Sequence, residues 1–236
     1  KGKGSIDVPG VFKSLNKTQE APYSALYRFN HNYLLCTSPE RFIAKRGEKI
    51  IAQPIKGTAP RSENPEKDKA NIQDLKNSEK EQAENVMIVD LVRNDLSKTA
   101  IKNSVKVEEL FGVESFNAVH QMVSTITSQV NPEADIEDVI FGSFPMGSMT
   151  GAPKIKAMEL IEEFESFSRG LYAGSVGYIA PDGDFDFNVV IRSVFYNSAE
   201  EKLAVRVGSA LTIHADPARE YEECLLKAGK ILDQFK

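Results

Sequence analysis

The chain has 236 residues, 41% of them hydrophobic, with a formal net charge of −5 and an isoelectric point near 5.4. This length and composition are typical of a soluble globular protein that can bury a full core. The acidic balance disfavours a nucleic-acid partner, because binding along phosphates requires a basic face. No apolar run approaches the roughly 20 residues that span a bilayer, so no membrane partner is expected.

The two cysteines, Cys36 and Cys224, lie far apart in the sequence and lack metal-ligand spacing. A disulfide framework or a zinc site therefore has no support, and we expect a reducing, cytoplasmic setting. The sequence does not begin with methionine. We therefore expect it to be a piece of a longer protein.

Short β-rich runs alternate with longer helical runs, which predicts one α+β domain. Residues 21–42 predict a hairpin that turns near His31, and residues 48–55 predict a further strand. Residues 64–96 have a helical pattern with a break at Asn77, where Ser78 can cap the second helix.

The second half of the chain continues this alternation. Residues 114–130 have strand chemistry, and residues 151–165 predict a helix with Pro153 in its first turn. Residues 171–196 predict a hairpin that turns around Asp182 and Gly183. The last helix is expected to begin with Asp216 as its cap and Pro217 as its first residue.

The stretch AQPIKGTAPR, residues 52–61, places Lys56 among Pro54, Gly57 and Pro60. Proline and glycine at this density predict a sharp bend with free backbone amides. The lysine therefore belongs either to a solvated turn or to a built site.

Two helices each carry a Glu-x-x-Glu pair beside their apolar positions. Glu81 and Glu84 share the apolar face of one helix, so either a cation meets them or they mark the wet edge of the domain. Glu220 and Glu223 lie at the edge of the last helix's apolar stripe, where an exposed ion pair between Glu223 and Lys227 is the simpler reading. Two such pairs would suit a magnesium ion, which prefers carboxylate oxygen.

Six motifs occur in a fixed order: SPERF, PIKGT, EQAENVMIVDLVRNDL, FPMGSMTGAPK, RGLYAGSVGYI and HADPAREYEECLLKA. From about residue 22 to the C-terminus the chain resembles the chorismate-binding enzymes, which include anthranilate, aminodeoxychorismate, isochorismate and salicylate synthases. The resemblance implies a magnesium-dependent enzyme acting on chorismate, with an α+β fold built as a β-sandwich of antiparallel sheets with helices outside. Family members usually have a further N-terminal half, so residues 1–236 would be the chorismate-binding catalytic domain at the C-terminal end of a longer architecture.

The resemblance also implies four magnesium-binding carboxylates, two direct and two through water: Glu84 and Glu223, then Glu81 and Glu220. The metal would bind the ring carboxylate of chorismate. Lys227 and the backbone amides around Gly208 would meet the same carboxylate. The family usually has two glycines where this chain has Ser209 and Ala210, and this departure puts their part in carboxylate binding in question.

Further side chains are implied for the rest of the substrate. Tyr172 and Arg192, expected on the paired strands of the 171–196 hairpin, would clamp the enolpyruvyl carboxylate, because a planar guanidinium binds a carboxylate at two points. Ser148 would hydrogen-bond nearby, and His120 would bind the departing ring hydroxyl. Without the resemblance, Tyr172 reads as a core aromatic, Arg192 as a surface ion pair and His120 as a structural histidine.

Lys56 separates the branches of the family. Anthranilate synthases usually have a small residue at this position, whereas PIKGT resembles the aminodeoxychorismate synthases. If Lys56 attacks the carbon ortho to the ring carboxylate first, ammonia must enter at the para carbon and expel the lysine. The lysine must be neutral to attack, so its ordinary pKa of about 10.4 would have to fall. Glu40 is the expected general acid and base.

Because ammonia is mostly ammonium at neutral pH, a glutamine amidotransferase partner that delivers ammonia is implied by the resemblance. The product would be 4-amino-4-deoxychorismate, a precursor of para-aminobenzoate and folate. Two alternatives stay open: an anthranilate or isochorismate synthase in which Lys56 is a bystander, and a non-catalytic chorismate-binding module.

Overall fold

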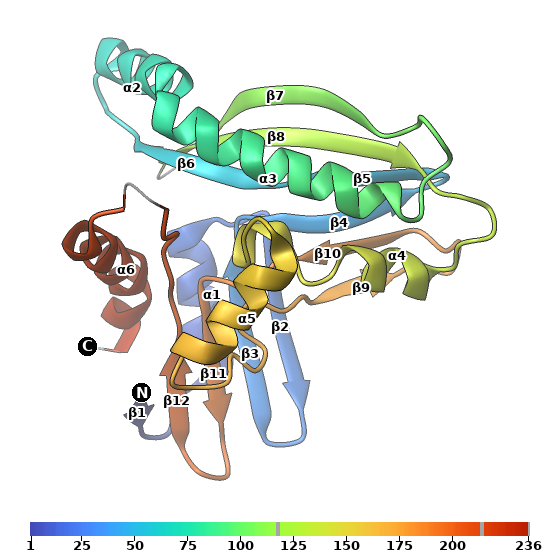
Figure 1. Ribbon diagram of the computed structural model, residues 1–236. Helices are drawn as coiled ribbons and strands as arrows, with labels where there is room; N and C mark the ends of the chain where they lie inside the picture. Colours follow the sequence, from blue (N-terminus) through green and yellow to red (C-terminus); the bar gives the residue numbers. More distant parts are fainter. Residues whose placement is uncertain (117–118, 213–214, 236) are drawn as a thin grey trace. The chain divides into compact units, whose positions relative to one another are not determined.

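The computed structural model describes residues 1–116, 119–212 and 215–235. The chain forms two compact units, one made of its two ends, 1–39 and 190–236, and one made of residues 40–189. Each unit combines helices with an antiparallel sheet, which confirms the α+β fold class (Figure 1). That the whole chain acts as one catalytic domain stays a prediction.

The unit made of the chain ends contains a five-stranded sheet in the order β1-β12-β11-β3-β2. Its core joins Leu15, Leu35, Val194 and Ile231, so both terminal helices contribute to it. The predicted hairpin near His31 is confirmed, since Phe29 pairs with Asn32. The elements are β1 Gly2–Lys3, α1 Val8–Gln19, β2 Tyr23–Phe29, β3 Asn32–Ser38, β11 Ser193–Asn197, β12 Lys202–Val205, α6 Pro217–Leu232 and η2 Asp233–Phe235.

The unit made of residues 40–189 contains a seven-stranded sheet, ordered β6-β8-β5-β4-β10-β9, with β7 also paired to β8. The helix α3 runs along strands β6 and β8 (Figure 1). The strands are β4 Arg41–Arg46, β5 Lys49–Gln53, β6 Ile55–Pro60, β7 Lys106–Ser115, β8 Val119–Gln129, β9 Gly177–Ile179 and β10 Phe185–Asn188. The helices are α2 Pro65–Asn77, α3 Glu79–Ser97, α4 Ile136–Ser143, η1 Gly147–Met149 and α5 Lys154–Phe164.

Side-chain caps define where several helices begin. Ser78 accepts a hydrogen bond from the Glu81 amide and separates α2 from α3, as the sequence predicts. Asp216 accepts from the Arg219 amide, and Pro217 is the first residue of α6. These starts follow from local chemistry, because a cap satisfies amides that have no partner inside the helix.

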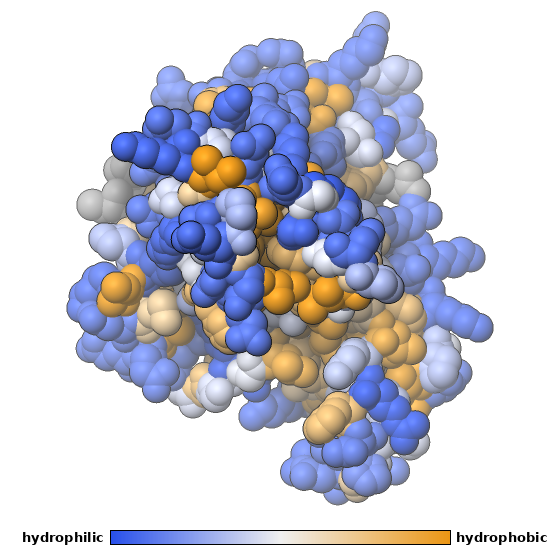
Figure 2. All heavy atoms as spheres, turned by 90° about the vertical axis from the view of Figure 1, so that its right-hand side faces the viewer, coloured by the Kyte–Doolittle hydropathy of each residue, from blue (hydrophilic) through white to orange (hydrophobic). Residues whose placement is uncertain are grey.

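One face of the molecule is largely hydrophilic, with hydrophobic residues gathered in patches (Figure 2). Within the described part of the chain, no helix is long and apolar enough to cross a membrane.

The structure corrects the expected bend at residues 52–61. Strand β6 begins at Ile55 and pairs with β8, with a shift of register between Ile55 and Thr58. Lys56 therefore lies on a bulged strand. Gly57 allows the bulge, because its φ is +92° and a Cβ atom there would lie 3.0 Å from Leu75 and 3.1 Å from the Glu81 carboxylate.

Gly57→Ala should lower the free energy of unfolding by about 1–3 kcal/mol, because it combines a left-handed backbone with two close contacts. Gly183→Ala is the matched control, since Gly183 has a φ of +84° and only the Lys45 amine near its Cβ position. Denaturant unfolding of both variants separates crowding from backbone strain. Equal losses of unfolding free energy in Gly57→Ala and Gly183→Ala would contradict close packing of α3 against the bulge.

Candidate active site

Glu40 lies directly before β4 and is 6% exposed. Its backbone carbonyl accepts a hydrogen bond from the Val189 amide at 3.0 Å, which holds the residue in place. Burial raises the pKa of the Glu40 carboxyl to about 7, although Ser148, the Lys56 charge and the Ile55 backbone each lower it. A carboxyl with this pKa can donate or accept a proton at neutral pH.

The bulged strand brings Lys56 to Glu40. The charge of the lysine acts on the Glu40 carboxyl, and the Lys56 side chain is half-buried. Two residues 16 positions apart in the sequence, a potential nucleophile and a potential acid or base, thus share one site. Enzymes that form covalent intermediates place a nucleophile near an acid or base, and that Lys56 acts in this way stays a prediction.

Ser148, in the short helix η1, is the third predicted residue at this place. Its hydroxyl is close enough to lower the pKa of Glu40, yet in the described part of the chain it meets no partner with hydrogen-bond geometry. We treat it as an electrostatic neighbour of Glu40, because hydrogen bonds weaken steeply away from their preferred geometry.

A cavity within the unit 40–189 adjoins Glu40 and Ser148, and Lys56 is not among the residues that line it. The space in it that is open to the centre of a water-sized molecule is about 20 Å³. Glu40 and Ser148 supply polar groups to a wall that is otherwise largely apolar, with Phe42, Val92 and Met146 among its residues. An apolar pocket with a few convergent polar groups is typical of a binding site for a small molecule.

His120 lies elsewhere in the same unit, outside the lining of this cavity. It is fully buried on β8, with Nδ1 2.8 Å from the Ser115 hydroxyl and Nε2 3.0 Å from Asp68. Asp68 also accepts a hydrogen bond from Arg61. That His120 binds the departing ring hydroxyl stays a prediction. It would require His120 to give up its contact with Ser115 or with Asp68.

Glu81 and Glu84 are half-buried on α3, on the face that also buries Ile88, as the helical pattern predicts. The Glu81 carboxylate lies beside Gly57, next to Lys56. Glu84 is 4.0 Å from the Lys80 amine, a loose ion pair across one helical turn. Glu81 therefore lies on the side of α3 that faces the bulged strand. Glu84, three residues further along, lies on the same face of the helix or at its edge.

The other two predicted carboxylates lie on α6. Glu220 accepts a hydrogen bond from the Ser209 hydroxyl, and Glu223 pairs with Lys227 at 2.5 Å. Lys227 also donates to the Gly208 carbonyl at 3.0 Å. Lys227 and Gly208 thus lie together, but through the Gly208 carbonyl, so their predicted binding of the ring carboxylate stays a prediction. Ser209, where the family usually has glycine, donates its hydroxyl to Glu220.

No group of three or more His, Cys, Asp or Glu side chains among the described residues is placed to hold a metal ion. The four predicted carboxylates come two from each compact unit. The magnesium site therefore stays a prediction.

The expectation that Tyr172 and Arg192 lie on paired strands is wrong. Tyr172 is buried in the loop between α5 and β9, where its amide bonds to the Arg169 carbonyl. Arg192 lies between β10 and β11 with a φ of +52°, and its carbonyl accepts two hydrogen bonds from Thr37. The strands are shorter than their apolar pattern because the backbone turns at both places. The carboxylate clamp stays a prediction.

The sequence analysis missed a buried ion-pair network beside the cavity. Asp95, on α3, lies 2.9 Å from the Lys98 amine and 2.5 Å from the Lys154 amine. Burial lowers the pKa of Lys154, while Asp95 raises it. The only sequence signal was that Lys154 ends the motif FPMGSMTGAPK, since nothing local predicts that Asp95 meets a lysine 59 residues away.

Comparison with known proteins identifies the family of the chain. Residues 2–233 match the family described as chorismate binding enzyme, so the chain belongs to the chorismate-binding enzymes. It is 42% identical to aminodeoxychorismate synthase component 1 of Klebsiella aerogenes over 226 residues, which cover 96% of this chain and 50% of the relative. It is 36% identical to anthranilate synthase component 1 of Haloferax volcanii, covering 99% of this chain and 45% of the relative.

A solved structure supports the fold. The chain aligns with anthranilate synthase component I of Streptococcus pneumoniae with a TM-score of 0.88 and 30% identity, covering 98% of this chain and 50% of that one. The chain therefore spans about half the length of these relatives.

The raised pKa of Glu40 makes a prediction about stability. Since the folded state binds this proton more tightly than the unfolded state, ionising Glu40 should destabilise the fold as the pH rises from about 4.5 to about 7. Glu40→Gln should remove this loss of unfolding free energy, which reaches about 3 kcal/mol at pH values above the pKa of the folded state. Urea unfolding at several pH values measures it, with the exposed Glu63→Gln as control. A constant stability difference between Glu40→Gln and wild type across this range would contradict the assignment.

Proposed function

We propose that this chain carries the chorismate-converting site of an aminodeoxychorismate synthase, which makes 4-amino-4-deoxychorismate from chorismate and ammonia. The observation that carries the proposal is that Lys56 lies near enough to a buried Glu40 for its charge to act on that carboxyl, whose pKa is about 7. The relatives named aminodeoxychorismate synthase component 1 support it.

In the first step the neutral Lys56 amine attacks the ring carbon ortho to the carboxylate. The ring double bond shifts, and the bond to the para hydroxyl breaks. Glu40 gives its proton to the departing hydroxyl, which leaves as water, and then takes the proton released by the lysine nitrogen. The result is a covalent adduct on Lys56 and a Glu40 carboxyl that is protonated again.

In the second step ammonia attacks the para carbon. The double bond shifts back, and the bond to the Lys56 nitrogen breaks. One proton passes from the attacking nitrogen through Glu40 to the lysine, which returns to its neutral amine. The sum of both steps is chorismate plus ammonia giving aminodeoxychorismate plus water, so all atoms balance.

The four predicted carboxylates have the chemistry that a magnesium ion prefers, because they are hard oxygen donors. Glu84 and Glu223 would bind the ion, and Glu81 and Glu220 would hold its waters. When bound, the ion would neutralise the ring carboxylate of the substrate. Lys227, already paired with Glu223, would add a positive charge for the same group.

The proposed nitrogen source is a glutamine amidotransferase subunit. The bacterial relatives are named component 1, which implies a second component for those proteins. We propose such a second component for the present chain as well. Anthranilate synthesis is the second candidate, favoured by the match to anthranilate synthases. The two differ in where nitrogen enters the ring.

Wild-type protein with chorismate, magnesium and ammonium salt should give the para-amino isomer as its main product. Lys56→Ala should lose most of it, because the ortho carbon is no longer blocked. Lys45→Ala, which changes a lysine on β4 with no part in the site, should behave as wild type. Chromatography with mass spectrometry of the product identifies the isomer. Anthranilate as the main wild-type product would exclude the proposal.

Omitting ammonia isolates the first step. An adduct with the mass of chorismate less one water should then form on Lys56, located by peptide mapping. A Lys56→Ala variant that makes aminodeoxychorismate at the wild-type rate would refute covalent catalysis.

Glu84→Gln should raise the magnesium concentration for half-maximal activity by about 10-fold or more, because one charged ligand becomes a weaker neutral one. Glu79→Gln changes an exposed carboxylate in the first turn of the same helix and serves as control. Titrating activity with magnesium measures the difference. An unchanged magnesium requirement in Glu84→Gln would remove this residue from the metal site.

A further inference from the structure

The cavity beside Glu40 has a second polar region at the end of α4. Ser143 is the last residue of this helix, is 4% exposed, and lines the cavity. Its backbone carbonyl accepts a hydrogen bond from Lys154 at 3.2 Å, so the residue is held in place. Its hydroxyl, however, has no hydrogen-bond partner within the described ranges of the chain. A buried polar group in this state is usually satisfied by a water or by another small polar molecule.

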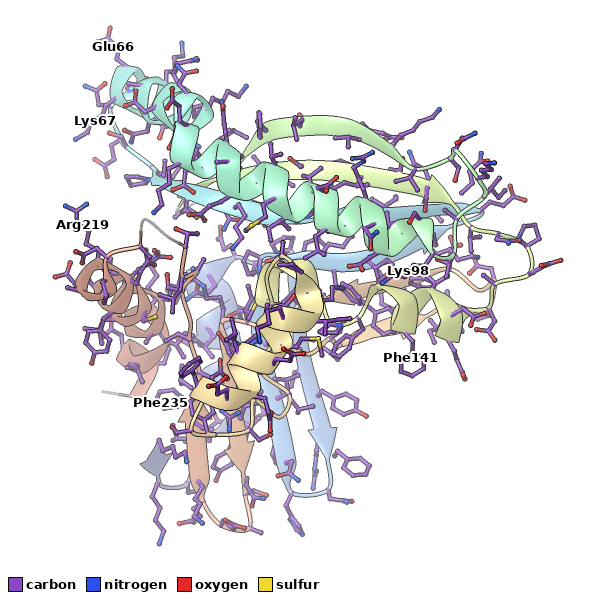
Figure 3. The ribbon with its side chains drawn as sticks, viewed as in Figure 1. Glu66, Lys67, Lys98, Phe141, Arg219 and Phe235 are labelled. Atoms are coloured by element: carbon purple, nitrogen blue, oxygen red, sulfur yellow. The ribbon has the colours of Figure 1, made fainter. Side chains whose placement is uncertain are left out.

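The charges in the cavity wall favour a neutral ligand over a cation. Asp95 lines the cavity, but its carboxylate already contacts the amines of Lys98 and Lys154. Figure 3 shows Lys98 at the C-terminal end of α3, where it also donates to the Gly142 carbonyl of α4. The other charged residues of the wall are Arg41, which pairs with Asp186 at 2.9 Å, and Glu40, whose carboxyl is kept partly protonated by its burial. The cavity therefore offers little to offset the desolvation of an ammonium ion.

The size of the free space also limits the ligand. The wall includes the apolar residues Phe42, Ile43, Leu96 and Met146, and the space open to the centre of a molecule the size of water or ammonia is about 20 Å³. Such a molecule needs only about 10 to 15 Å³ for its centre. The substrate ring must therefore bind outside this space.

We propose that this cavity holds the ammonia molecule that attacks the ring, with the Ser143 hydroxyl accepting one of its N–H groups next to Glu40. The inference rests on the proposed function, because it assigns a place to the second substrate of that reaction. Held by one N–H, ammonia keeps its lone pair free to form the bond to carbon. When that bond forms and the bond to Lys56 breaks, the protonated Glu40 carboxyl gives its proton to the lysine nitrogen and takes up the proton that the attacking nitrogen loses.

The test uses two substitutions at Ser143 and one matched control. Ser143→Ala removes the hydroxyl, and Ser143→Val also fills the space. Ser128→Val makes the same change at another buried serine, on β8, which is 3% exposed and does not line this cavity. Thermal unfolding checks that each variant folds, and Ser143→Ala should remain folded, because removing a buried hydroxyl without a partner relieves a cost.

The primary measurement is the KM for ammonia at saturating chorismate, with ammonium salt as nitrogen source. Ser143→Ala should raise it about 5-fold, the factor expected for one neutral hydrogen bond, and Ser143→Val should raise it further. Ser128→Val should leave it unchanged. The rate of adduct formation on Lys56 without ammonia should fall by less than the ammonia-dependent step in both Ser143 variants.

An unchanged KM for ammonia in Ser143→Val, with product still formed, would overturn the ammonia site and leave the proposed function intact. Equal losses in adduct formation and in the ammonia-dependent step would also overturn it, since the cavity would then serve the ring. A wild-type protein that gives no ammonia-dependent product would overturn both proposals. Higher use of methylamine relative to ammonia in Ser143→Gly would support the site, because the cavity would be wider.

Discussion

The candidate site depends on the burial of one carboxyl group, that of Glu40. Taking a carboxylate out of water is costly, and the protein meets this cost by leaving the group partly protonated and by placing the Lys56 charge nearby. Both features can contribute to catalysis, since the partly protonated carboxyl is a proton donor and Lys56 is a potential nucleophile. The site needs β4 and β6 to present these two residues together, and that is the task of the seven-stranded sheet.

Helix α3 connects the parts of the site within the unit 40–189. Near its start, Glu81 lies against the glycine of the β6 bulge. Near its end, Asp95 holds Lys154, which in turn binds the carbonyl of Ser143 at the cavity. A shift of α3 would therefore disturb three parts of the site at once: strand β6 with Lys56, the predicted metal-site residue Glu81 and the wall of the cavity. The helix also buries Asn85, which accepts a hydrogen bond from the Ser124 hydroxyl of β8 at 2.6 Å.

Much of the local structure was predictable because it depends on neighbours in the chain. Ser78 and Asp216 start their helices through bonds to amides three residues on, and the turn at His31 joins two adjacent strands. Prediction failed where distant segments decide the backbone. Residues 52–61 read as a bend, but pairing with β8 makes them a bulged strand. Tyr172 and Arg192 read as strand residues, but each lies where the backbone turns between elements.

The sequence alone determined the family, through six motifs in order, and with it the residue types of the site, because motif spacing along a chain needs no knowledge of the fold. It also determined that Glu81 and Glu84 share a helix face, since helical periodicity is a local property. Only the tertiary structure decided that Glu40 is buried, that Lys56 lies near enough to act on its charge, and that Ser143 faces the same cavity. Desolvation and charge interactions depend on distances through space, and residues from β4, β6 and α4 come together only when the sheet and its helices pack.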